Sequence, residues 1–212
     1  MQIKKLVLFL MACALVSIGA ASQSFATTVT VDLTGVNGVT QGGVYADPYS
    51  GTINNSQAIL VCDDFSHETY FNKPWQANVS TFADLSGVRF QQGAPAATLQ
   101  AYDEAAYLYT QLLANPSNYG NISFALWALF TPSAKSSSGF TSGAQNWLTQ
   151  AGNQSYYAGE FSNFEILTPV QPGSGSPQEF LTTTTTPEPA DILLFATGFG
   201  VLSLMLRKKL FA

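Results

Sequence analysis

Residues 95–130, PAATLQAYDEAAYLYTQLLANPSNYGNISFALWALF, decide the fold class because the period of the hydrophobic pattern changes here. After Pro95, apolar side chains recur every three or four residues, which predicts an amphipathic helix that ends at Asn115-Pro116. A second helix is predicted over residues 121–130, and Ser142 is the predicted cap of a third, shorter helix. The middle of the chain is therefore expected to be helical.

Strand patterns lie on both sides of these helices. Residues 28–33 alternate between apolar and polar side chains, which predicts a strand with one buried face. Further strands are predicted over residues 58–65, 68–75 and 78–82, and a last one over residues 161–167. This order predicts a single α+β domain, residues 27–167, of antiparallel strands with an inserted group of helices.

The segment that follows, residues 168–186, loses the pattern of a hydrophobic core. It is rich in Pro, Gly and Ser and ends in five consecutive threonines, Thr182–Thr186. Such a composition predicts a flexible, fairly extended tether. The threonine run is a candidate for O-glycosylation, and an unmodified spacer is the alternative.

The last residues, 187–212, combine three features in a fixed order. An acid bracketed by prolines precedes 15 residues that are apolar or small, Ile192 to Leu206, and a basic cluster follows them. A helix over this run rises about 22 Å, against about 30 Å for the hydrocarbon core of a bilayer. We predict a short transmembrane helix whose basic end reaches the headgroups, and a core helix is the alternative. The residues of the two flanking features are Pro187, Glu188, Pro189, Arg207, Lys208 and Lys209.

This arrangement resembles the PEP-CTERM sorting signal of exported bacterial proteins. The resemblance implies that an exosortase, a membrane protease, recognises the chain and cleaves it near Pro187-Glu188-Pro189. The resemblance indicates the location to which the protein is sent, but it does not indicate the molecular role of the protein.

The beginning of the chain also predicts export. Lys4 and Lys5 precede an apolar stretch, residues 6–20, and small residues before position 27 form a signal-peptidase cleavage site after Ala26. An uncleaved membrane anchor is the alternative. A signal peptide over residues 1–26 and an inward-facing basic end predict a precursor in the inner membrane with its domain outside the cytoplasm.

The charge of the exported part excludes some functions. Between residues 27 and 186, 3 basic residues stand against 11 acidic residues, which gives a net charge of −8. Nucleic-acid binding needs clustered Lys and Arg side chains, so we expect no nucleic-acid partner. Electrostatic docking on anionic lipids is excluded for the same reason.

Residues 62–68, CDDFSHE, form the densest polar cluster and contain the only histidine of the chain. Cys13 leaves with the signal peptide, so Cys62 is the single thiol of the mature domain, either a buried apolar side chain or a reactive group. One histidine without a second His or Cys makes a poor zinc site, and we expect no metal and no cofactor. Cys62 and His67 are a conceivable nucleophile pair, but neither an orienting partner nor an oxyanion-hole motif is evident, so no catalytic residue is assigned.

A second resemblance concerns the domain. Cys62 at the end of an apolar strand and Ala125-Leu126-Trp127 on a later helix resemble the thioester domains of bacterial surface adhesins. In these domains a cysteine condenses with a glutamine two residues before the triplet. Here Ser123 occupies that position, and because serine has no side-chain carbonyl, the resemblance implies an inactive relative with a free Cys62 thiol.

Together these features predict an exported protein of the cell surface or the extracellular matrix, associated with exopolysaccharide or a biofilm. We expect a structural or adhesive role without enzymatic activity. The partners would be signal peptidase, exosortase, the membrane before processing, and extracellular polysaccharide or surface proteins. Tyr156-Tyr157, in a glycine-containing segment, is a candidate for stacking on sugars. The alternative is a reactive domain that uses Cys62, as a thioester-type covalent adhesin or as a nucleophile.

Overall fold

The computed structural model describes residues 27–170 and 175–184. The predicted signal peptide, the sorting motif and the C-terminal membrane helix with its basic end lie outside the described residues. Within the two described ranges, no helix has the length and apolar character needed to cross a bilayer. The transmembrane helix therefore stays a prediction from the sequence.

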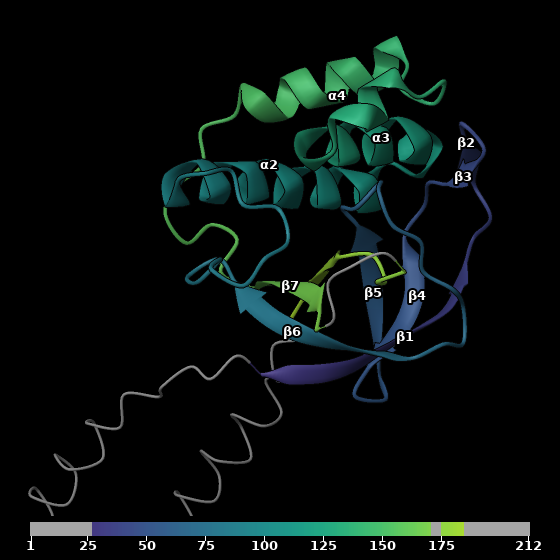
Figure 1. Cartoon of the computed structure of the whole chain (residues 1–212). Helices are drawn as coiled ribbons and strands as arrows, with labels where there is room; N and C mark the ends of the chain where they lie inside the picture. Colours follow the sequence, from purple (N-terminus) through teal and green to yellow (C-terminus); the bar gives the residue numbers. More distant parts are fainter. Residues whose placement is uncertain (1–26, 171–174, 185–212) are drawn as a thin grey trace, which may run out of the picture.

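Six antiparallel strands close into a barrel, in which the order around the barrel is β1, β4, β5, β8, β7 and β6 (Figure 1). β1 pairs with both β4 and β6, so the first strand joins the two halves of the sheet. Closure matters because it leaves no exposed sheet edge. The strands are β1 (Thr28–Val36), β4 (Tyr49–Ile53), β5 (Ser56–Cys62), β6 (Trp75–Thr81), β7 (Phe164–Pro169) and β8 (Phe180–Thr183).

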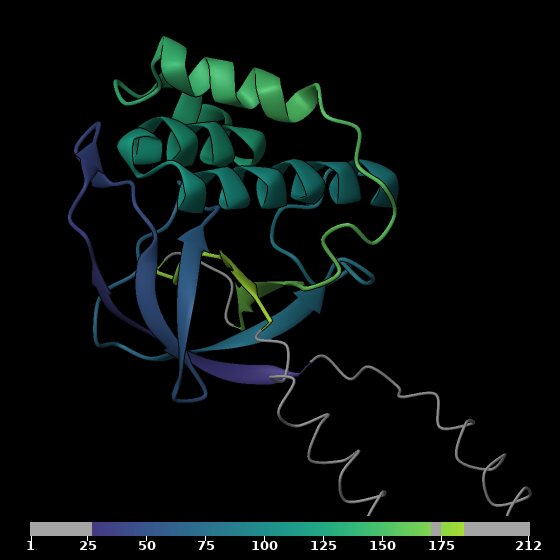
Figure 2. The ribbon, with the colours of Figure 1, turned by 180° about the vertical axis from the view of Figure 1, so that it is seen from behind.

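Three helices cover one side of the barrel (Figures 1 and 2). They are α2 (Pro95–Ala114), α3 (Tyr119–Phe130) and α4 (Ser142–Gly152), with short 3-10 turns at Pro116–Asn118 and Pro132–Ser136. Proline stands in the first turn of α2, where its missing N–H costs nothing. The cap of α4 is Thr141, one residue before the expected Ser142, and its hydroxyl accepts from the N–H groups of Gly143 and Ala144. The predicted α+β class with antiparallel strands and three helices is thus confirmed.

The strands separate two hydrophobic cores because successive side chains point to opposite faces. Leu60 and Cys62 of β5 lie inside the barrel with Phe180 of β8. Val61 and Leu181, their neighbours in sequence, face outward and pack in the cluster that contains the helices. The outer core therefore holds the helices on the barrel, and the inner core fills the barrel itself.

The predicted tether over residues 168–186 is wrong for the part that the structure describes. β7 continues to Pro169, and β8 fills the gap between β5 and β7. Phe180 and Leu181 are fully buried, so this segment gains hydrophobic free energy by pairing despite its loop-like surroundings. Thr182 is also buried, and its hydroxyl donates to the carbonyl of Ile59. Thr182 is therefore no longer a candidate for O-glycosylation. The domain extends beyond residue 167 to at least Thr184.

One other strand prediction needs correction, and one strand was not predicted. Residues 68–75 form a loop except for Trp75, which begins β6. Conversely, β4 begins inside the sequence Asp47-Pro48-Tyr49-Ser50-Gly51, which has the composition of a turn. Gly51 is needed in this strand because a Cβ atom there would lie 2.5 Å from the carbonyl oxygen of Asp32 and 2.7 Å from Cδ1 of Leu60.

Candidate functional site

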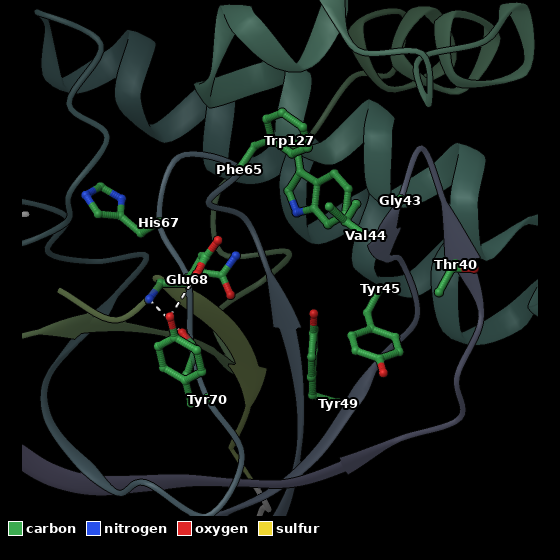
Figure 3. Close-up of a pocket in the computed structure, with 12 residues that line it drawn as sticks. Thr40, Gly43, Val44, Tyr45, Tyr49, Phe65, His67, Glu68, Tyr70 and Trp127 are labelled. Atoms are coloured by element: carbon green, nitrogen blue, oxygen red, sulfur yellow. Dashed lines mark hydrogen bonds between the residues drawn. The ribbon is translucent and has the colours of Figure 1, made fainter. Parts of the chain in front are cut away.

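A cleft of about 460 Å³ lies beside the junction of the barrel and the helices (Figure 3). One group of lining residues comes from the small hairpin β2–β3 (Thr40–Gln41 and Val44–Tyr45), and another comes from the loop that follows β5. Tyr49 of β4 and Trp127 of α3 also line it. Its volume falls in the range of about 300–1,000 Å³ that is usual for small-molecule sites.

Trp127 connects the helical layer to the end of β5. Its indole Nε1 donates to the carbonyl oxygen of Cys62 over 2.9 Å. Its ring packs against Phe65 with a centroid distance of 5.4 Å and against Phe124 with 4.9 Å. Because its polar atom and most of its surface are engaged, Trp127 is a fixed wall of the cleft.

Three tyrosines supply aromatic rings and hydroxyl groups to the lining of the cleft. Tyr45 and Tyr70 are exposed, at 44% and 57%, and Figure 3 shows them on opposite sides of Tyr49. Tyr49 is 9% exposed, yet its hydroxyl forms no hydrogen bond with the described residues. Burial raises the pKa of Tyr49, so its hydroxyl stays protonated and can donate.

The rims of the cleft are held by contacts within the loop that follows β5. The hydroxyl of Tyr70 donates to Oε2 of Glu68 over 2.9 Å, and the ammonium nitrogen of Lys73 lies 4.8 Å from the centre of the Tyr70 ring. Phe71 packs against Tyr45 and Tyr49, with centroid distances of 6.2 and 6.3 Å. This aromatic contact joins the loop to the hairpin.

Asp64 organises a charged cluster next to the cleft. Its fully buried carboxylate accepts from Nη1 of Arg89 and lies 2.8 Å from Nδ1 of His67. Arg89 also donates to the carbonyl of Pro177 over 3.0 Å and to the hydroxyl of Ser176 over 2.7 Å. The positive charge of Arg89 therefore compensates Asp64 and ties the segment before β8 to the loop after β5.

A second pair of buried acids lies behind this cluster. Glu179 accepts from the hydroxyl of Tyr102 over 2.6 Å, from the backbone N–H of Arg89 over 2.8 Å, and from the hydroxyl of Thr168. Burial and then the nearby charge of Glu179 raise the pKa of Asp63 well above its usual range. Burial also raises the pKa of Glu179, but its hydrogen bonds from Thr168, Tyr102 and Arg89 oppose this shift. We therefore assign the higher pKa of the pair to Asp63.

The structure places Cys62 and His67 in different environments. The thiol of Cys62 is buried in the barrel core, with Sγ 3.2 Å from the carbonyl oxygen and 3.3 Å from the backbone nitrogen of Asp64. Burial raises the pKa of this thiol well above its usual value. His67 instead contacts Asp64 and Arg89, and among the described residues it forms no hydrogen bond with Cys62.

The residues of the thioester-domain resemblance lie near one another. Ala125-Leu126-Trp127 contacts the end of β5 through the bond from Trp127 to Cys62. Ser123, at the position of the expected glutamine, donates its hydroxyl to the carbonyl of Ala46 over 2.8 Å. Ser123 thus has a structural partner outside β5.

The tyrosines singled out in the sequence for sugar stacking differ from those that line this cleft. Tyr156 is half-buried against Phe161 and donates to the carbonyl of Ala151 over 2.8 Å, whereas Tyr157 is 71% exposed. Both line a separate cavity of about 620 Å³. Across residues 27–170 and 175–184, no cluster of three or more His, Cys, Asp or Glu side chains could hold a metal ion.

Sequence reasoning missed Tyr45, Tyr49, Tyr70, Arg89 and Gln178. Gln178 also lines the cleft, and its Nε2 donates to the backbone carbonyl of Asp64 over 2.7 Å. Single aromatic residues in glycine-rich or polar loops carry no periodic signal, and their proximity depends on barrel closure.

Comparisons with protein-family models, curated proteins and solved structures find no match to this chain.

Proposed function

We propose that the protein is an exported cell-surface or extracellular-matrix protein with a structural or adhesive, non-enzymatic role. Its precursor would be held in the inner membrane by residues 192–206 and processed by signal peptidase at Ala26 and by an exosortase at Pro187-Glu188-Pro189. The sequence signals at both ends support the export and sorting.

The single structural observation that carries a binding role is the cleft beside Trp127. It offers aromatic faces and a free hydroxyl at the surface of a rigid barrel, which suits recognition of a ligand without chemistry. The first and last strands that the structure describes, β1 and β8, both belong to the barrel (Figures 1 and 2).

The reactive alternative has less support. The thiol of Cys62 is buried and its raised pKa disfavours the thiolate, which is the nucleophilic form. A thiol titration tests it: we expect one thiol that alkylates only after unfolding. An internal thioester would instead be indicated if the folded protein resists alkylation, and if methylamine abolishes this resistance and adds the mass of the amine to the protein.

Mass spectrometry of the protein from its native host tests the main proposal. We expect a new N-terminus at Thr27 and a C-terminus near Glu188, in the surface or extracellular fraction. Glu188→Ala should leave an unprocessed, membrane-bound precursor, whereas the matched control Glu160→Ala should be processed normally. An intact chain from Met1 to Ala212 dissolved in the cytosol would refute the proposal.

A further inference from the structure

We propose that the cleft between the β2–β3 hairpin and the loop after β5 binds a neutral polysaccharide segment. This inference rests on the proposed surface role and names the class of ligand that the site would take. It follows from three properties of the lining: its ring faces, its unsatisfied hydroxyl and its lack of free positive charge.

The ring faces are the first property. Tyr45 and Tyr70 stand on opposite sides of Tyr49 and remain exposed, although large aromatic side chains usually gain by burial (Figure 3). A pyranose ring has apolar C–H faces and a polar rim of hydroxyls, so it matches side chains that are apolar on their faces and polar at their tips. One hairpin and one loop each supply such a ring, which would let a chain of sugars lie between them.

The Tyr49 hydroxyl is the second property. It belongs to a residue that is 91% buried, since its exposed fraction is 9%, and no described residue satisfies it. Tyr49 lines the cleft, so a ligand hydroxyl can donate to its hydroxyl or accept from it. The side chains of Thr40, Thr69 and Gln178 add uncharged polar groups to the same lining.

The charges are the third property. The lining contains no Lys or Arg, and Arg89 is committed to Asp64, Ser176 and Pro177. Lys73, outside the lining, lies over the Tyr70 ring at one rim of the cleft. The domain charge of −8 would repel an acidic polymer. Glu68 is the acid that lines the cleft, and it already accepts from the Tyr70 hydroxyl. A neutral, hydroxyl-rich ligand fits this balance.

A titration of the full-length chain with neutral oligosaccharides tests the inference. The chain is purified in a detergent without a sugar headgroup, because such headgroups would compete. The probes are gluco-, manno- and galacto-hexaoses, with spermidine as the cationic comparison and polygalacturonate as the acidic one. We expect at least one hexaose to change the intrinsic fluorescence saturably, with a Kd of about 1 mM or tighter.

Variants locate the binding. Tyr45→Ala and Tyr70→Ala should each weaken it about tenfold or more, because each removes one exposed ring. Tyr49→Phe should weaken it while keeping the ring, and the matched control Tyr157→Ala should leave it unchanged. Since Tyr45 and Tyr70 are exposed, these variants should fold, which near-ultraviolet circular dichroism checks.

Three results would overturn the inference: no saturable binding of any hexaose, binding that Tyr45→Ala and Tyr70→Ala leave intact, or saturable binding of spermidine or polygalacturonate alone. The surface role fails separately. A chain that is processed and exported but binds no hexaose overturns only the ligand class, whereas an unprocessed cytosolic chain overturns the proposed location.

Discussion

Arg89→Met tests whether the charged cluster beside the cleft holds the domain together. The substitution keeps most of the length of the side chain but removes the charge that compensates Asp64, whose carboxylate is fully buried. It also removes the bonds from the guanidinium to Ser176 and Pro177, which precede β8.

The expected cost is large because an uncompensated charge would remain buried. Removing one partner of a buried ion pair typically costs about 3–5 kcal/mol. For a domain of this size each kcal/mol lowers the melting temperature by about 2–4 °C, so we expect a fall of about 10 °C. Urea denaturation followed by tryptophan fluorescence measures the free energy of unfolding, with thermal melts as a second readout.

Two further variants make the test specific. Lys135→Met removes a charge from an exposed side chain and should change the free energy of unfolding by less than about 0.5 kcal/mol. Asp64→Asn combined with Arg89→Met should recover part of the loss, because the stranded charge is then absent. A single Arg89→Met variant within about 1 kcal/mol of the natural chain would refute the reasoning.

Three other predictions follow from the same contacts. Phe180→Ala should lower the free energy of unfolding by about 3–5 kcal/mol, because Phe180 is fully buried in the barrel. The exposed control Thr184→Ala should be nearly neutral. Equal, small effects of the two variants in urea denaturation would mean that β8 is not part of the core. Asp63→Asn should stabilise the domain, and the gain should be larger at neutral pH than in acid. The raised pKa of Asp63 means that the folded state keeps a proton which the unfolded state releases. The stability that Asp63 contributes in the natural chain is therefore full below about pH 4 and is lost as the pH rises. Unfolding experiments between pH 4 and 8 should therefore show a gain that grows with pH, and a gain that shrinks would contradict the assignment. Asp103 should titrate near pH 6, since burial, Glu160 and Glu104 raise its pKa to about 6, and carbon-detected NMR should show a lower midpoint in Glu160→Gln.

β1, α2 and α3 could be predicted from the sequence, because they have strong periodic patterns that local physics dictates. The alternation of Val29, Val31 and Leu33 places these residues inside the barrel, and the helical spacing after Pro95 gives α2. Cys62 was identified as a candidate buried thiol from the apolar run before it, and the structure places it there.

Closure of the barrel could not be predicted in this way. β8 is short and stands among Pro, Gly, Ser and Thr residues, so its local sequence favours a loop, and only pairing with β5 and β7 makes it a strand. The loop at residues 68–74 is the reverse case, because Phe71 packs against the inner core although the loop belongs to no strand. Local propensity is a weak guide where tertiary pairing supplies most of the free energy.

The sequence by itself determined the α+β class, the three helices and the signals on which the proposed export depends. Only the tertiary structure decided the closed barrel, the compensation of Asp64 by Arg89 and the meeting of Tyr45, Tyr49 and Tyr70 in one cleft. The reason is that periodicity is a property of neighbours along the chain. Contacts between residues 25 or 114 positions apart depend instead on how the strands close on one another, because pairing brings distant segments together.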